Sequence, residues 1–260
     1  MVIETIGRQL KESADEIFVR SENDTYIFPR TIEPFETDVK IAPRNYALLK
    51  DGDTVRHAVS MIQRLNGNTF ENAVKKSFKK GLSVPTPRLF MSHYKNVNDS
   101  LSENSVLYDA SGNLISGRRL ENYVDKLNYD SWVWLNAYFE EGDGFLDLDL
   151  VTITGITEKG EFIKSSEPLE DCLEGNYVLA DLDSLNSQGL PTRKSPLKSY
   201  ESGKTVYFWK PEQDGIASFR AAVRGRDSGL SLSLVREPSV GSDRLGVFNV
   251  AEGTPKKFII

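Results

Sequence analysis

The chain has 260 residues, of which 39% are hydrophobic, and a net charge of −6 from 32 Lys and Arg against 38 Asp and Glu. This composition is typical of a globular protein that can bury a core, and it excludes disordered and fibrous classes. The acidic balance provides no overall field that would attract a polyanion, so general binding of nucleic acid or of an anionic membrane is disfavoured. No stretch approaches the roughly 18 apolar residues of a membrane span, and the N-terminus lacks the pattern of a secretory signal. We therefore expect a chain synthesised as a soluble protein, without membrane insertion.

Short apolar runs alternate with prolines over the first fifty residues. Pro29, Pro34 and Pro43 forbid a long helix there. This pattern predicts an extended arm over residues 1–50, packed on a body that residues 51–260 form.

Three segments have the three- and four-residue apolar spacing of an amphipathic helix. The first is 53–66, where Asp53 is placed as an N-cap and Gly67 lies just beyond the end. The second begins at Thr69 and ends in a run of lysines before Gly81. The third is predicted over 118–128.

Later segments have the composition of strands. Residues 132–139 are aromatic and rich in β formers, and 145–154 alternate leucine with aspartate. Residues 81–117 are dense in Pro, Asn, Asp and Gly, which is typical of loops. Further short strands are expected at 106–108, 177–179 and 206–209. The order predicts an α+β fold with short antiparallel strands and two or three helices in its N-terminal half.

Few residues offer nucleophilic or metal chemistry. The single cysteine, Cys172, excludes an internal disulfide, and its acidic neighbours are expected to raise its thiol pKa. His57 and His93 have no nucleophile or ligand at a motif spacing, so each is interpreted as a packed or surface residue. The run 203–205 resembles the end of a phosphate-binding loop, but the earlier glycine is missing and a strand follows. We expect no catalytic residue, cofactor or metal.

An acidic set surrounds the turn between the two longest predicted strands. Carboxylate oxygens can converge on a hard cation, but the spacing matches no calcium loop, and a solvated strand face is the simpler interpretation. The members of this set are Glu140, Glu141, Asp143, Asp147 and Asp149. The nearby aromatic residues Trp132, Trp134, Tyr138 and Phe139 lack interleaved basic residues, which favours a buried sheet face over a stacking platform.

Residues 217–250 differ in composition from the rest of the chain. They contain no Lys, Gln, Met or Trp, a single Glu, and five basic residues that are all arginine. Arginine offers a planar fork to anions and aromatic surfaces, and it is enriched at recognition hot spots. The segment is either a recognition surface or a surface stretch that became rich in Arg and Ser by chance.

The end of the chain resembles the variable proteins of diversity-generating retroelements, and it is most similar to their archaeal group. The likeness rests on Ala217, Phe219, the run 245–248 and the run 251–254. It implies a C-type lectin fold whose C-terminal region displays residues rewritten by adenine-directed mutagenesis. Asn-type codons that are rewritten in this way cannot become Lys, Gln, Glu, Met or Trp. This fits the composition of 217–250, with Glu237 then a fixed position.

The chain departs from related families with the same fold. Calcium-binding lectins use Glu-Pro-Asn and Trp-Asn-Asp motifs, whereas this chain has Glu237-Pro238-Ser239 and no Trp-Asn-Asp. Formylglycine-generating enzymes need a cysteine pair, and Cys172 stands alone. The resemblance therefore implies neither a calcium-bridged sugar site nor that catalysis.

The resemblance and the composition together predict a non-enzymatic protein that binds an unknown protein or surface ligand, with display on a cell surface or virus particle left open. Phe219, Leu245, Gly246 and Val247 are expected to be structural. The residues expected to face a partner are Ser218, Arg220, Val223, Arg224, Arg226, Ser231, Ser233, Val235, Arg236, Val240, Asp243, Arg244 and Phe248. Two alternatives remain: a metal-dependent hydrolase that uses Asp147, Asp149, Glu140 and His93, and a structural or virion subunit in which the segment packs on another chain.

Overall fold

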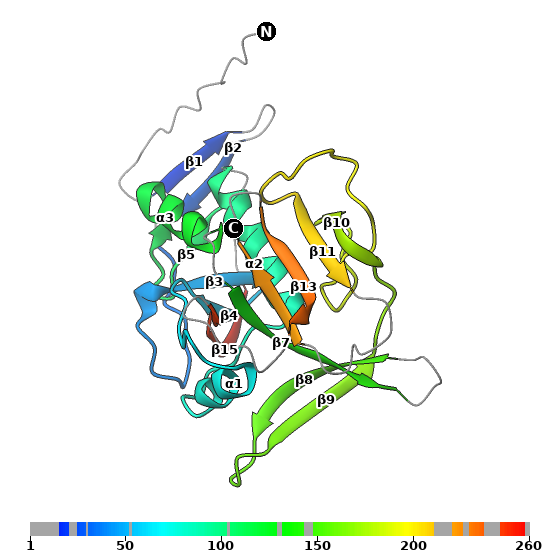
Figure 1. Cartoon of the computed structure of the whole chain (residues 1–260). Helices are drawn as coiled ribbons and strands as arrows, with labels where there is room; N and C mark the ends of the chain where they lie inside the picture. The colour runs from blue at the N-terminus through cyan, green and yellow to red at the C-terminus, as the bar shows by residue number, and fades with distance from the viewer. Residues whose placement is uncertain are drawn as a thin grey trace.

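A computed structural model gives the arrangement of the chain (Figure 1). The residues that it describes are 16–20, 25–29, 31–51, 54–102, 105–128, 132–142, 148–210, 220–225, 229–236 and 245–257. Within these residues the protein is a mixed α+β structure, mostly sheet, with three α-helices in its N-terminal half. This confirms the α+β prediction at that level.

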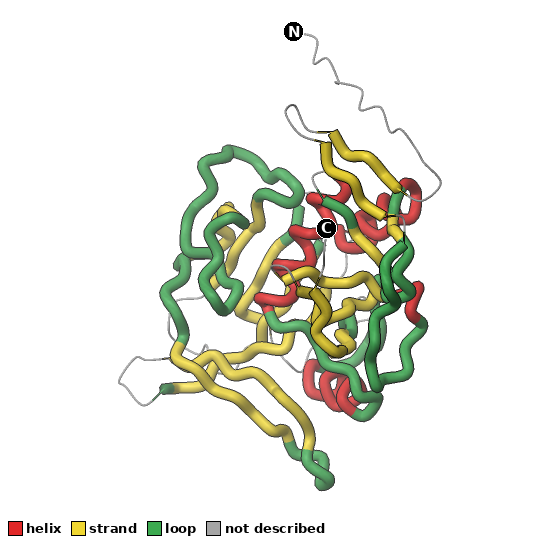
Figure 2. The backbone as a smooth tube through the Cα atoms, turned by 180° about the vertical axis from the view of Figure 1, so that it is seen from behind, coloured by secondary structure: helices red, strands yellow, loops and turns green. Residues whose placement is uncertain are grey.

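The largest sheet has the strand order β10-β11-β13-β12-β7-β8-β9, with β14 also paired to β7. Most neighbours are antiparallel, and β11–β13 and β14–β7 are parallel. Its strands are β7 (Trp132–Glu141), β8 (Leu148–Ile156), β9 (Phe162–Pro168), β10 (Gly175–Asp181), β11 (Thr205–Lys210), β12 (Arg220–Arg224), β13 (Ser231–Arg236) and β14 (Leu245–Gly246). The β8–β9 hairpin extends away from the body, and β9 is largely exposed (Figure 2).

Strand β7 lies at the centre of the core because both of its faces are buried. Val133, Leu135 and Phe139 join the cluster formed with the helices α2 (Pro87–Leu101) and α3 (Gly117–Asn128). Trp134 and Tyr138 point to the opposite face, where they pack with Phe70 of α1 (Phe70–Phe78). The sheet is thus covered by α2 and α3 on one side and by α1 on the other.

A second sheet brings together segments that are distant in sequence. Its order is β15-β4-β3, with β3 spanning Tyr46–Asp51, β4 Thr54–Ser60 and β15 Val250–Lys257. The boundary between the predicted arm and body therefore falls inside β3. The smaller elements are β1 (Glu16–Arg20) paired with β2 (Thr25–Pro29), β5 (Leu107–Tyr108) paired with β6 (Leu114–Ile115), and the 3-10 helix η1 (Pro43–Asn45).

The helix predicted over 53–66 is wrong, because its first half is strand β4. This strand is central in its sheet, so Val59 is buried on one face and Val55 and Ala58 on the other. A register shift beside Arg56 breaks the alternation of the strand. Burial on both faces together with a bulge therefore produced the three- and four-residue spacing of a helical stripe.

The helix α2 was missed, because its prolines and asparagines were interpreted as loop signals. Pro87 stands at the first helical position, where no intrahelical N–H is needed, and the Thr86 side chain accepts from the Leu89 N–H at 3.3 Å. The Asn98 amide donates to the Tyr94 carbonyl within the helix at 2.8 Å. The Ser100 hydroxyl likewise donates to the Asn96 carbonyl at 2.8 Å, so two of the polar side chains of this helix are satisfied by its own backbone.

Other expected elements are confirmed. The helix expected from Thr69 is α1, the helix at 118–128 is α3, and the strand at 132–139 is β7. The aromatic side chains of β7 are buried in a sheet, as predicted, with Trp134 fully buried and Trp132 partly so. None of the helices in the described ranges has the length and apolar character needed to cross a membrane.

Candidate functional site

Strands β12 and β13 lie within the segment 217–250 that the sequence singled out. Ala222 lies opposite Ser233, and Arg224 lies opposite Ser231. The alternate residues, among them Val223 and Leu232, point into the core under α2 and α3. One face of this strand pair therefore packs under α2 and α3. The other carries arginine and serine, and it is also covered at Ala222, which is fully buried in the cluster of Phe70 and Trp134.

The two arginines of β12 stack on aromatic rings of neighbouring elements. The Arg220 guanidinium lies 4.2 Å from the centre of the Tyr138 ring and 5.3 Å from that of Phe70. Arg224 lies 5.4 Å from the ring centre of Trp132. No basic residue is interleaved with these aromatics in the sequence, and it is the pairing of β12 with β7 that brings the two arginines against them.

Burial changes the electrostatics of Arg220. Loss of water around the guanidinium lowers its pKa, and the neighbouring Tyr138, Glu71 and Glu140 act in the opposite direction. The Arg220 side chain stays charged and is held against aromatic faces. It contributes to the support of the sheet as well as to its surface.

The tyrosine Tyr177 extends this sheet face, and sequence reasoning missed it. Its ring stacks on Tyr207 of β11 with 4.7 Å between ring centres, and its hydroxyl lies 3.2 Å from the Ser231 Oγ. It is 41% exposed and has a φ of 61°, which is unusual for a residue with a Cβ. On the same face, Trp209 of β11 lies opposite Ser233 of the neighbouring strand β13. Only the pairing of β10, β11 and β13 reveals this group.

The structure places the predicted contact residues in different environments. Val223 and Phe248 are in the core, at 1% and 2% exposure, which corrects the expectation that they face a partner. Ser231 and Ser233 lie on the arginine-bearing face but are also buried. Val235 and Arg236 belong to β13. The remaining candidates lie outside the described residues: Ser218, Arg226, Val240, Asp243 and Arg244.

The residues expected to be structural are confirmed where they are described. Val247 is fully buried, and Leu245 pairs with Trp132 in β14–β7. A Cβ on Gly246 would lie 2.3 Å from the Asn66 Oδ1 and 2.6 Å from the Arg64 carbonyl oxygen, so no side chain fits there. Phe219 lies outside the described residues.

The acidic set is engaged in local contacts. Glu140 forms an ion pair with Lys164 at 2.7 Å, and Asp149 accepts from the Ser166 hydroxyl at 2.7 Å. Asp143 and Asp147 lie outside the described residues. Across the part of the chain that is described, no three His, Cys, Asp or Glu side chains come together in a group that could hold a metal ion.

The two histidines lie apart from that set. His93 is buried in α2, its Nε2 is hydrogen-bonded to the Tyr123 hydroxyl of α3, and burial lowers its pKa to about 3. It is a packed histidine, as predicted, and it is neutral at physiological pH. His57 lies on β4 opposite Leu49 and Glu252, not on a helix.

The remaining sequence candidates have ordinary surroundings. Burial raises the pKa of the Cys172 thiol, and Glu174 and Asp171 act in the same direction against Lys210. This agrees with an unreactive thiol. The side chain of Lys204 pairs with Glu201, and Thr205 begins strand β11. A phosphate-binding loop has no support there.

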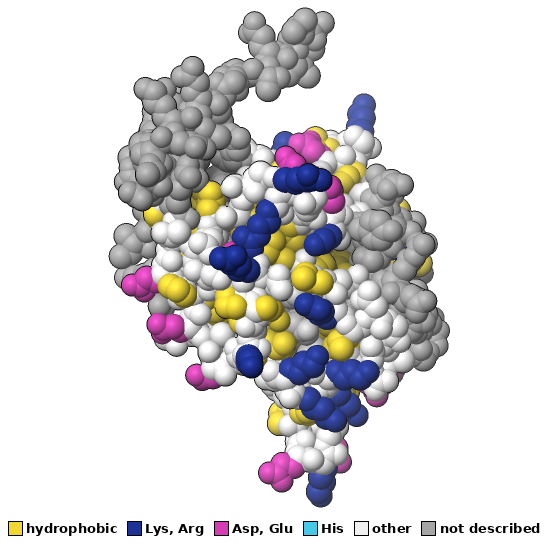
Figure 3. Space-filling model, turned by 90° about the vertical axis from the view of Figure 1, so that its left-hand side faces the viewer, with side chains coloured by type: hydrophobic (Ala, Val, Ile, Leu, Met, Phe, Trp, Pro, Cys, Tyr) yellow, Lys and Arg dark blue, Asp and Glu magenta, His cyan; other side chains and the backbone are white. Residues whose placement is uncertain are grey.

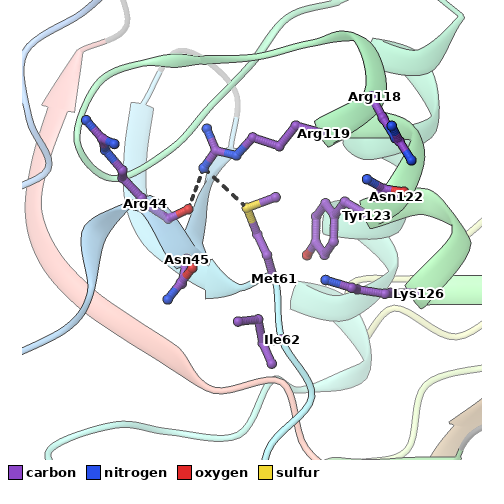
Figure 4. Close-up of a pocket in the computed structure, with 9 residues that line it drawn as sticks. All are labelled: Arg44, Asn45, Met61, Ile62, Arg118, Arg119, Asn122, Tyr123 and Lys126. Carbon is purple, nitrogen blue, oxygen red and sulfur yellow. Dashed lines mark hydrogen bonds between the residues drawn. The ribbon is translucent and has the colours of Figure 1, made fainter.

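A basic cavity beside α3 is the second feature that sequence reasoning missed. It has a volume of about 380 Å³ and lies between α3, η1 and the residues after β4 (Figure 4). The adjacent arginines Arg118 and Arg119 in the predicted helix were its signal in the sequence. Residues before β3 complete the site, and only the tertiary structure brings them to the helix.

Comparison with known proteins adds no relative. No protein-family model matches the sequence, and neither a curated protein nor a solved structure matches the chain.

Proposed function

We propose that this protein is a non-enzymatic ligand-binding protein that presents a diversified recognition surface on a C-type lectin-like scaffold, as a variable protein of a diversity-generating retroelement. The observation that carries the proposal is the shared face of β12 and β13. Arg220 and Arg224 lie there with Ser231 and Ser233, while the residues between them are locked in the core.

The composition of this face supports a binding role. Tyr177 and Trp209 border the arginine- and serine-bearing strands. Tyr, Trp and Arg supply rigid contact area at binding hot spots, and Ser supplies adaptable hydrogen bonds. In this proposal the exposed Tyr177 and the partly exposed Arg224 make direct contact with the ligand, and the buried serines shape the floor beneath them.

The pairing of β4 with β15 also supports a fold that is held together by strands outside the recognition face. Val59 lies opposite Val250, so the strand that precedes the helices is joined to the last strand of the body. A closed scaffold of this kind holds the segment between β11 and β15 by both ends. Loops and strand faces fixed in this way can vary without unfolding the domain.

The most direct test is the DNA beside the gene. The proposal requires a near-copy of the segment that encodes residues 217–250, differing mainly at adenines, close to a reverse transcriptase gene. Codons mismatched at adenines should include that of Arg224 and exclude those of Gly246 and Val247. If no such copy exists anywhere in the genome, the retroelement origin is wrong.

A stability test examines the surface itself. Replacing Arg224 by Asn, Asp or Tyr should lower the free energy of unfolding by less than about 1 kcal/mol, because Arg224 is partly exposed and a cation–ring contact such as that with Trp132 is worth little at such a site. The matched control is Val223→Asn on the same strand, which buries an unsatisfied amide and should cost about 3 kcal/mol. Equal losses in chemical denaturation would mean that Arg224 supports the fold and is not free to vary.

A further inference from the structure

The cavity beside α3 is lined by residues from two separate parts of the chain. Its walls come from the first three turns of α3, from η1 and from the two residues that follow β4. The lining residues are Arg44, Asn45, Met61, Ile62, Arg118, Arg119, Asn122, Tyr123 and Lys126. In Figure 4 Met61 and Tyr123 lie close to each other near the centre, and the Lys126 side chain points toward them, while Arg44 and Arg118 lie at opposite ends of the cavity. A volume of about 380 Å³ falls within the range of small-molecule sites.

Four of the nine lining residues are basic and none is acidic. Arg119 is already partnered, since it donates to the buried Asp109 carboxylate at 2.8 Å and to the Arg44 carbonyl. Arg44, Arg118 and Lys126 form no ion pair with any acidic residue in the described ranges. Among the described residues, three of the positive charges at the cavity therefore have no acidic partner.

The start of α3 adds to this positive field. Arg118 and Arg119 occupy its first turn, which contains no acidic residue. Basic side chains at a helix N-terminus oppose the helix dipole and cost helix stability. Arg119 is compensated by the buried Asp109, whereas Arg118 is not paired with an acidic residue of the described ranges. An anion bound beside Arg118 would gain from both the dipole and the side chain, so this residue suits the binding of an anion.

The surroundings of the cavity are basic as well. Figure 3 shows Lys and Arg side chains spread over the side of the molecule that carries α3 and β3, with Asp and Glu mainly toward its margins. The chain as a whole has a net charge of −6. A local field of opposite sign to the net charge concentrates anions at this side.

The uncharged lining residues narrow the class of anion. Asn45 and Asn122 offer amide donors, while Met61, Ile62 and the Tyr123 ring form an apolar part of the wall. A phosphate group has three oxygens that accept from several cations at once, and guanidinium groups bind it in a bidentate manner. The apolar part of the wall suits an organic group attached to the phosphate.

We propose that the cavity binds a phosphorylated small molecule, with Arg44, Arg118 and Lys126 around the phosphate and with Met61 and Tyr123 against its organic part. A small molecule fits better than a polymer because the basic residues line a single cavity of small-molecule size. The site shares no residue with the face of β12 and β13, so it stands independently of the function proposed above.

The test is a calorimetric titration of the full chain with inorganic pyrophosphate, at an ionic strength held constant with KCl. We expect saturable binding of one pyrophosphate per chain. The double variant Arg118→Gln/Lys126→Gln should bind at least tenfold more weakly. The matched control is Lys79→Gln/Lys80→Gln, which removes the same charge from exposed residues outside the cavity and should change the affinity less than twofold.

Three results would overturn the proposal. One is the absence of saturable binding up to about 10 mM pyrophosphate, because a cavity lined by three positive charges without an acidic partner among the described residues should bind more tightly than that. Another is an equal loss in the Lys79/Lys80 control, which would indicate diffuse attraction to the charged face. The third is tight binding of a single-stranded oligonucleotide that the cavity variant abolishes, with no binding of pyrophosphate, which would indicate a polymer. Thermal unfolding of both variants checks that they are folded.

Discussion

The arginines of β12 and those of the α3 cavity differ in what surrounds the guanidinium group. Arg220 is half-buried between the rings of Tyr138 and Phe70. Arg44 and Arg118 are exposed at the rim of a cavity, without an acidic partner among the described residues. The first environment uses the flat, weakly hydrated cation for packing, and the second leaves the charge available to a ligand.

This difference teaches that residue type alone does not assign a role. The sequence drew attention to the arginines of 217–250 because the composition of that segment was unusual. One of them, Arg220, contacts rings of both α1 and β7, and Arg224 contacts a ring of β7 alone. The arginines at the start of α3 looked like an ordinary helical surface. The substitutions below test whether the two environments are as different as the geometry indicates.

The largest effect is expected from removing the ring at the centre of the first environment. Phe70 packs edge-on against Trp134 and Tyr138, with 5.8 and 6.4 Å between ring centres, and it contacts Arg220. Phe70→Ala should lower the free energy of unfolding by about 3–5 kcal/mol, measured by urea denaturation. Phe78→Ala on the same helix, which is only partly buried, should cost less than half as much. A small loss for Phe70→Ala would mean that the ring cluster does not support the sheet.

The next effect concerns the buried pair of His93 and Tyr123, of which Tyr123 also lines the cavity. The pKa of His93 in the folded chain is about 3, below the 6.5 of an unperturbed histidine, because burial disfavours its charged form. Burying the neutral imidazole therefore makes its full contribution to the free energy of unfolding above pH 6.5. That contribution is lost as the pH falls toward 3. At pH 5 the loss from this residue should be about 2 kcal/mol.

His93→Gln isolates this contribution, because glutamine can bond to the Tyr123 hydroxyl and does not titrate. Between pH 7 and pH 5 the variant should lose less free energy of unfolding than the parent chain by about 2 kcal/mol. Parallel pH profiles of the two proteins would show that His93 is not buried in its neutral form. Carboxylates titrate in both proteins, so their effect cancels in the difference.

A smaller effect is expected at Arg220. Arg220→Ala removes the contacts with two rings and should lower the free energy of unfolding by about 1–2 kcal/mol. Arg220→Lys keeps the charge without the planar group, so it should recover only part of that loss. If alanine had no effect, the stacked arginine would be a surface residue like those of the cavity.

The smallest effect on stability is expected at Arg118. Arg118→Ala should leave the free energy of unfolding within about 0.5 kcal/mol of the parent value or raise it slightly, because a positive charge at a helix N-terminus opposes the dipole. The same variant should weaken pyrophosphate binding. A large destabilisation would make Arg118 a structural residue and would remove the contrast with Arg220.

The sequence alone determined the α+β class, the positions of α1, α3 and β7, and the buried character of the β7 aromatics. These features depend on local spacing, capping and β propensity, which a short window of sequence contains. It also identified Gly246 and Val247 as structural. Where a segment is packed from two sides, as β4 is, local spacing was misleading, because burial on both faces removes the alternation on which the period depends.

The tertiary structure decided which residues meet. The stacking of Arg220 on Tyr138 needs β12 to pair with β7, and the face of Tyr177 and Ser231 needs β10, β11 and β13 to come together across long connections. The cavity needs η1 and the end of β4 to lie against α3. No short segment contains these contacts, since they arise from burying apolar faces that are far apart along the chain, and the polar side chains are carried into place by that packing.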